Sequence, residues 1–190
     1  MLEDLEFLTP EEARRVIAAA GNSTEDKDLG RTWACLFTVL WETGIRISEA
    51  LALTPAVIQH DRILLTRRKK KIGTGQDYMP IRLATFNQLS RHITVAKLTA
   101  NKRLFPWTTQ GVNWRLKEIG RGLGIPKLHA HMFRHGFAMN YIAQAPGEQP
   151  AMITLAEIQR LLGHKSVAAT SVYTRPRMDT LAERLRGLKF

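Results

Sequence analysis

Hydrophobic residues recur at helical spacing along most of this chain, and short turn signals separate the segments. The sequence TPEE at residues 9–12 predicts a helix start, because it supplies an N-cap threonine, a proline at the first helical position and a glutamate three residues after the cap. Apolar residues then continue to residue 20, before Gly21. A second helix should cover about residues 29–43 and end at Gly44, with the apolar stretch WACLFTVLW buried.

The middle of the chain departs from helical spacing at two short extended runs. RILLT at residues 62–66 and DYMPI at 77–81 flank a lysine- and glycine-containing stretch, which predicts a β-hairpin with a long basic turn. Further helices are expected over residues 85–100, 108–123, 131–144, 154–162 and, in the tail, 178–190. The pattern predicts one mainly α domain over residues 1–190 with a small antiparallel β-hairpin or sheet, an α+β arrangement.

Composition narrows the class of protein. The 190 residues are 44% hydrophobic, which is enough to form a hydrophobic core without stabilising disulfides or structural metal ions. The single cysteine, Cys35, lies in an apolar run, which excludes a disulfide framework and a cysteine zinc site. The acidic N-terminus and the lack of any membrane-length apolar run favour a soluble, cytoplasmic protein with no membrane partner.

Charge gives the first indication of function. The formal net charge is +11, and RRKKK at residues 67–71 forms a dense basic cluster. An excess of this size attracts polyanions at long range, so double-stranded DNA is the expected partner. The alternative is a basic protein whose charge serves solubility alone.

The sequence HMFRHGFA at residues 131–138 has three possible explanations. A metal site would use His129, His131 and His135, but only the last two share a helical face, and the Arg134 guanidinium would repel the ion. A buried, hydrogen-bonded histidine would explain one residue, not a His-x-x-Arg pair on one face. A phosphate site remains, and neither a metal nor a cofactor is expected.

Two further segments make the phosphate hypothesis specific. In TGIRISEAL, Arg46 follows Gly44 and Glu49 lies one helical turn beyond it, and in LLGHKSVAATSVYT, His164 precedes Tyr173 by nine residues. Together with HMFRH, and in this order, these segments resemble the tyrosine recombinase (phage integrase) family. The resemblance covers essentially the whole chain and implies the catalytic-domain fold of that family.

The resemblance implies a site-specific recombinase that cuts and rejoins DNA through a 3′-phosphotyrosyl intermediate. Tyr173 would be the nucleophile and His131 its general base, with His164 as a second donor to the phosphate. Arg46 and Arg134 would neutralise the phosphate oxygens, since guanidinium offers paired donors at fixed geometry. Glu49 would either orient the Arg46 guanidinium or cap the local helix.

The basic turn would supply the proton for the leaving 5′-oxygen. In the family, a lysine on the hairpin turn donates this proton. Lys69 matches that position, although Lys70 or Lys71 could reach the 5′-oxygen instead. The remaining lysines, with Arg67 and Arg68, would contact DNA phosphates.

The chain departs from the family pattern at several points. Gly136 and Met139 stand where small hydroxyl residues are common, which affects local packing. The stretch AQAPGEQPAMI is longer than the usual link. We expect no separate N-terminal core-binding domain in this sequence, which suits either a catalytic fragment or a short recombinase resembling the fimbrial phase-variation invertases.

Assembly and two rival functions remain open. In the tail, Leu181, Leu185 and Leu188 share one helical face. That face could dock on its own domain or, as we expect, on a neighbour in a tetrameric synapse on DNA. The rivals are a type IB topoisomerase with the same chemistry and a non-cleaving DNA-binding regulator of the same fold.

Overall fold

A computed structural model of the chain describes residues 6–22, 24–65, 77–143 and 155–163. The chain divides into two compact units, one of residues 7–137 and one of residues 1–6 with 138–190. The described part is mainly helical with one two-stranded antiparallel sheet, which confirms the predicted class. None of its helices has the length and apolar character needed to span a bilayer.

The smaller unit contains, among described residues, the end of α6 (Ala130–Ala143) and α7 (Leu155–Leu162). Gly163 follows α7 with a positive φ of 63°, as the predicted stop at this glycine requires. The basic turn, the long link after residue 143 and the tail helix over 178–190 lie outside the described residues.

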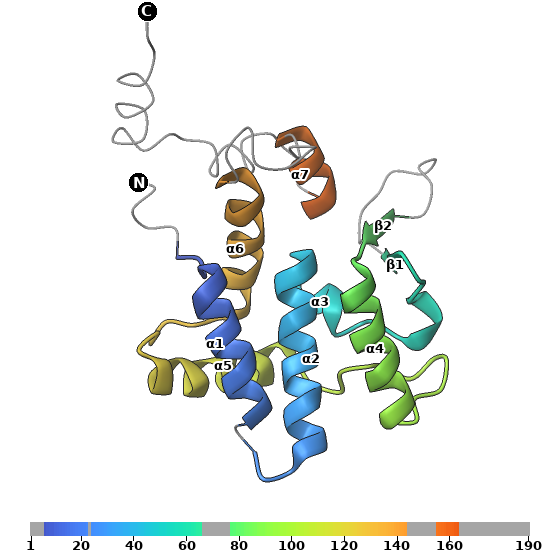
Figure 1. Cartoon of the computed structure of the whole chain (residues 1–190), viewed down its shortest axis with the longest axis horizontal. Helices are drawn as coiled ribbons and strands as arrows, with labels where there is room; N and C mark the ends of the chain where they lie inside the picture. Colours follow the sequence, from blue (N-terminus) through green and yellow to red (C-terminus); the bar gives the residue numbers. More distant parts are fainter. Residues whose placement is uncertain (1–5, 23, 66–76, 144–154, 164–190) are drawn as a thin grey trace, which may run out of the picture. The chain divides into compact units, whose positions relative to one another are not determined.

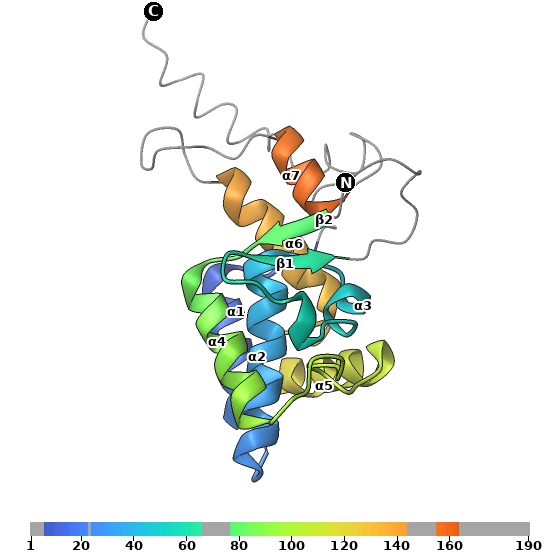
Figure 2. The same cartoon turned by 90° about the vertical axis from the view of Figure 1, so that its right-hand side faces the viewer.

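In the larger unit, α1 (Pro10–Asn22) and α2 (Lys27–Thr43) lie side by side (Figures 1 and 2). The predicted capping box of α1 is present, since the Glu12 N–H donates to Thr9 Oγ1 (3.2 Å) and the Thr9 N–H donates to Glu12 Oε2 (2.9 Å). α1 extends two residues beyond the predicted end.

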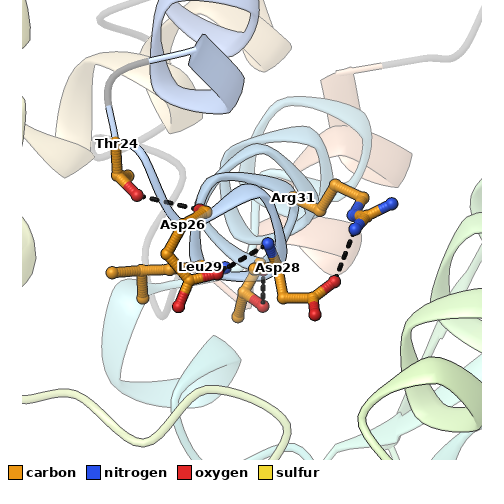
Figure 3. A network of polar contacts seen from close by, with 6 residues as sticks. Thr24, Asp26, Asp28, Leu29 and Arg31 are labelled. Atoms are coloured by element: carbon orange, nitrogen blue, oxygen red, sulfur yellow. Dashed lines mark hydrogen bonds and ion pairs between the residues drawn. The ribbon is translucent and has the colours of Figure 1, made fainter.

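α2 begins two residues before the predicted start because Asp26 is its N-cap. Asp26 Oδ1 accepts from the N–H groups of Asp28 (2.9 Å) and Leu29 (3.1 Å), as Figure 3 shows. The predicted end is confirmed: Gly44 adopts the left-handed conformation (φ 61°), and its N–H donates to the Leu40 carbonyl.

Close packing of α1 against α2 depends on a glycine. A Cβ added at Gly30 would lie 2.3 Å from the Gly21 carbonyl oxygen, closer than real Cβ atoms approach. The backbones of α1 and α2 can therefore approach this closely only because residue 30 is a glycine.

The sheet follows a short 3₁₀ helix, η1 (Pro55–Val57), and consists of β1 (Arg62–Leu65) and β2 (Asp77–Pro80). Leu65 pairs with Asp77, so the predicted basic turn joins these two ends. The buried residues are Ile63, Leu65 and Met79. The predicted hairpin is confirmed in its two strands.

Two more helices of the larger unit pack on α1 and α2. α4 (Leu83–Val95) packs on α2, and α5 (Thr109–Leu123) packs on α1. The prediction that α4 reaches residue 100 was wrong: Lys97 has a positive φ of 49°, so the helix ends before Leu98. Thr108 caps α5 through a 3.1 Å bond from the Gly111 N–H.

An aromatic row forms the centre of the core. Trp33 lies 5.8 Å from Phe37, and Phe37 lies 5.6 Å from Phe133 of α6, measured between ring centroids. Cys35, also on α2, is 2% exposed, and burial raises the pKa of its thiol to about 12. Cys35 is thus a core residue, as its apolar surroundings predict.

We expect Gly30→Ala to destabilise the protein by about 2 kcal/mol or more, because the added methyl group meets backbone that cannot rotate away. Gly122→Ala is the matched control. Gly122 is also helical, with nothing within 4 Å of an added Cβ, so the same change should be neutral or stabilise by up to about 1 kcal/mol. Urea denaturation of both variants measures this, and equal destabilisation would contradict the close-approach explanation.

Candidate active site

The C-terminal end of α2 places Arg46. Gly44 ends the helix, Ile45 is buried (1% exposed), and Arg46 occupies the N-cap position of the short helix α3 (Ile47–Ala50). The Arg46 carbonyl accepts from the N–H groups of Glu49 and Ala50, both at 2.9 Å. Arg46 is therefore held between two helices, with its backbone fixed on both sides.

Glu49 makes both contacts that the sequence left as alternatives. Its Oε2 accepts from the Arg46 N–H (2.8 Å), and its Oε1 accepts from Arg46 Nη1 (3.0 Å). The Glu49 side chain is 11% exposed, whereas that of Arg46 is 41% exposed. One carboxylate thus caps α3 and orients a guanidinium that solvent, or a ligand, can still reach.

Arg134, on α6, is 2% exposed. Its Nη1 donates a 2.8 Å hydrogen bond to the carbonyl oxygen of Gly44, ninety residues earlier. A buried charge needs compensation, and carbonyl groups at the C-terminal end of a helix form the negative end of its dipole. The end of α2 therefore both begins the Arg46 segment and binds Arg134.

Packing at three residues holds α6 in this position. Phe133 is buried against Phe37 of α2, and the Leu8 N–H donates to the Met132 carbonyl (3.4 Å). A Cβ at Gly136 would lie 2.6 Å from both the Leu8 carbonyl oxygen and the Trp41 ring. The absence of a side chain at Gly136 thus lets the segment before α1 lie directly on α6.

The structure also brings His131 to this cluster. The His131 side chain is exposed to solvent on one side and covered by protein on the other. This partial burial lowers the pKa of His131 below its usual 6.5, and the charges of Arg134, His129 and Arg46 lower it further. Near neutral pH the imidazole is therefore unprotonated and able to accept a proton. Its ring contacts His135 edge to face, with centroids 4.6 Å apart.

The histidines do not form a metal centre in the described part of the chain. His129 Nδ1 donates to the Lys127 carbonyl (2.9 Å), so that nitrogen is already used. Across residues 6–22, 24–65, 77–143 and 155–163, no three His, Cys, Asp or Glu side chains lie close enough to hold an ion.

The arrangement suits an anion with several oxygen atoms. Two guanidinium groups and a neutral imidazole gather where the end of α2 meets α6, and Glu49 fixes the orientation of one guanidinium. Guanidinium binds phosphate oxygens with paired donors, and a neutral imidazole can remove a proton from a nucleophile. The chemistry that fits is transfer at a phosphodiester.

Four of the predicted site residues are thereby located, namely Arg46, Glu49, His131 and Arg134. The others lie outside the described residues: Tyr173, His164, Lys69, Lys70, Lys71, Arg67 and Arg68. Sequence reasoning missed the Gly44 carbonyl as a partner of Arg134, because a backbone acceptor has no side-chain identity that a motif could reveal.

The known proteins that this chain resembles belong to one family. Residues 6–180 match the sequence profile of the phage integrase family. The chain belongs to the phage integrase family. The tyrosine recombinase XerA of Pyrococcus furiosus is 32% identical over 187 residues, which cover 93% of this chain and 59% of that relative. The tyrosine recombinase XerC of Brucella suis is 29% identical over 176 residues, covering 88% and 53%.

This phage integrase family member therefore spans only 53–59% of the length of these two relatives. Among solved structures, the XerA recombinase is similar with a TM-score of 0.71 at 22% identity, covering 97% of this chain and 66% of that one. The catalytic domain of the bacteriophage HP1 integrase has a TM-score of 0.65 at 22% identity, covering 97% and 95%. The Tn1549 transposon integrase in complex with transposon right end DNA has a TM-score of 0.69 at 17% identity, covering 97% and 67%. These likenesses confirm the catalytic-domain fold predicted from the motifs.

We expect the depressed pKa of His131 to make stability depend on pH. The unfolded chain takes up this proton first, so the associated stability is present above about pH 6.5 and is lost as pH falls through the folded-state pKa. His131→Gln should remove this contribution. Urea denaturation between about pH 8 and about pH 5 should show a smaller loss of stability in the variant than in the unmodified chain, and equal losses would contradict the assignment.

Proposed function

We propose that this chain is the catalytic domain of a site-specific DNA recombinase. It cuts and rejoins double-stranded DNA through a 3′-phosphotyrosyl intermediate at Tyr173, without a metal or nucleotide cofactor. Cutting forms one phosphoester bond as another breaks, so the bond energy is retained for rejoining.

The hydrogen bond from Arg134 to Gly44 is the observation that supports this proposal most directly. It joins two of the three segments that contain the family motifs and places Arg134 beside the start of the Arg46 segment. Both arginines lower the pKa of His131, so the three residues share one electrostatic site. Such a site can stabilise a five-coordinate phosphorus and accept a proton from the attacking hydroxyl group.

The other roles complete the reaction. The Tyr173 oxygen attacks the phosphorus and His131 takes its proton, while Arg46, Arg134 and His164 bind the non-bridging oxygens. The 5′-oxygen leaves with a proton from Lys69. If the family's lysine matches a later position in the turn, Lys70 or Lys71 donates the proton instead. Glu49 orients Arg46, and Arg67 and Arg68 contact neighbouring phosphates.

DNA is the proposed partner for two independent reasons. The net charge of +11 favours a polyanion, and the relatives at 29–32% identity are named tyrosine recombinases. Self-association in a tetrameric synapse, through the tail at residues 178–190, is a finer part of the proposal. It rests on the helical spacing of Leu181, Leu185 and Leu188.

Tyr173→Phe should bind DNA as the unmodified chain does and form no covalent adduct, since only the nucleophilic oxygen is removed. Suicide substrates, whose cleaved end diffuses away, trap the adduct as a shifted band on a denaturing gel. A shifted band that persists in the variant would remove Tyr173 from this role.

Relaxation of a plasmid that lacks any recombination site distinguishes the rival functions. A recombinase domain should leave it supercoiled, whereas a topoisomerase would relax it. A DNA-binding regulator would bind without forming an adduct on any substrate, including substrates that contain the sequence the protein binds best.

Arg46→Lys should reduce adduct formation by ~100-fold or more while DNA affinity changes little, because lysine cannot present the paired donors that stabilise the transition state. Arg31→Lys is the matched control. Arg31 is an exposed arginine at the start of α2, paired with Asp28 at 2.5 Å, and its replacement should leave cleavage unchanged. Equal losses of affinity and cleavage in Arg46→Lys would make Arg46 a binding contact only.

A further inference from the structure

The first turn of α6 receives a hydrogen bond from outside its own helix. Ala130 is the first residue of α6, and its N–H has no acceptor within the helix. This N–H donates to Oδ1 of Asn113, a residue of α5, at 3.0 Å. Because a backbone N–H can only donate, the atom facing it must be the amide oxygen of Asn113.

The helix that carries Asn113 is anchored in the core. Val112, directly before Asn113, and Leu116, three residues after it, are both fully buried. The connection from α5 to α6 also packs closely. The Ile125 N–H donates to the Gly120 carbonyl (2.8 Å), and a Cβ at Gly120 would lie 2.3 Å from the Ile125 carbonyl oxygen. The Asn113 bond therefore links the first turn of α6 to α5, and the connection between the two helices is tightly packed at Gly120.

The position of this turn matters because His131 follows Ala130 directly and Arg134 lies one turn further on. The buried Arg134 is restrained by its bond to Gly44, but His131 is exposed and lies nearer the helix end. A helix end without a cap frays, and a shift of about 1 Å in a reacting group can reduce a rate by ~100-fold.

We propose that Asn113 is a positioning residue for the reaction: it holds the first turn of α6 so that His131 stays in place beside Arg46 and Arg134. Asn113 acts through the backbone of Ala130 and contacts neither DNA nor the reacting atoms. This inference rests on the proposed function for its catalytic consequence, and on the structure alone for the restraint of the turn.

Asn113→Ala and Asn113→Asp separate the acceptor atom from the rest of the side chain. Aspartate retains an oxygen at the same place, and a carboxylate is also favourable at a helix N-terminus. In Asn113→Ala we expect adduct formation at saturating DNA to slow ~10- to 100-fold, with DNA affinity within about twofold of the unmodified chain. Asn113→Asp should restore the rate to within about threefold.

Asp26→Ala is the matched control for the loss of a helix cap. It removes both cap bonds at the start of α2, the network drawn in Figure 3, on a helix whose other end meets the site. This variant should lower the melting temperature without slowing adduct formation in the folded protein. A comparable slowing in Asp26→Ala would mean that general loss of stability explains the Asn113 result.

Hydrogen exchange tests the restraint without any activity. The amides of residues 130–134 should exchange faster in Asn113→Ala than in the unmodified chain or in Asn113→Asp. Unchanged exchange, an unchanged cleavage rate in Asn113→Ala, or a loss confined to DNA affinity would each overturn the proposal. If the unmodified chain forms no adduct, the proposed function fails, and exchange at residues 130–134 still decides whether Asn113 holds the turn.

Discussion

The hydrogen bond between Arg134 Nη1 and the Gly44 carbonyl oxygen is the interaction on which the rest of the site depends. It compensates a guanidinium that is only 2% exposed, and it does so with the end of the helix from which the Arg46 segment begins. A buried charge is costly unless polar groups compensate it, so this bond favours the arrangement in which α6 lies at the end of α2. The core contact between these two helices and the position of both arginines therefore depend on the same place in the fold.

In the proposed reaction the same cations would perform two tasks. Their charge would attract the phosphate, and, added to the effect of burial, it lowers the pKa of His131, which keeps a histidine beside the proposed phosphate site neutral. Glu49 pairs with Arg46, and Arg134 donates to the Gly44 carbonyl oxygen at the end of α2. A third full positive charge on His131 would bind phosphate more tightly but would remove the proton acceptor.

Local interactions were predictable from the sequence and distant ones were not. The cap at Thr9 and the stop at Gly44 were predicted correctly, because each depends on residues within one turn. The end of α4 was misplaced, since Lys97 adopts a positive φ without the glycine that usually indicates it. The family motifs predicted Arg46, Glu49, His131 and Arg134 as site residues, and the structure places all four at the end of α2 and the start of α6. No pattern reveals that Asn113 caps a helix seventeen residues later.

Burial of Cys35 has a practical consequence. Its thiol is 2% exposed with a pKa of about 12, so almost none of it is thiolate at neutral pH. The sequence has no other cysteine. A cysteine introduced at an exposed position, such as Lys117 or Arg121 on α5, would therefore react selectively with maleimide dyes while the native thiol stays in place. Single-molecule fluorescence of a chain labelled at one point becomes possible without first altering the core.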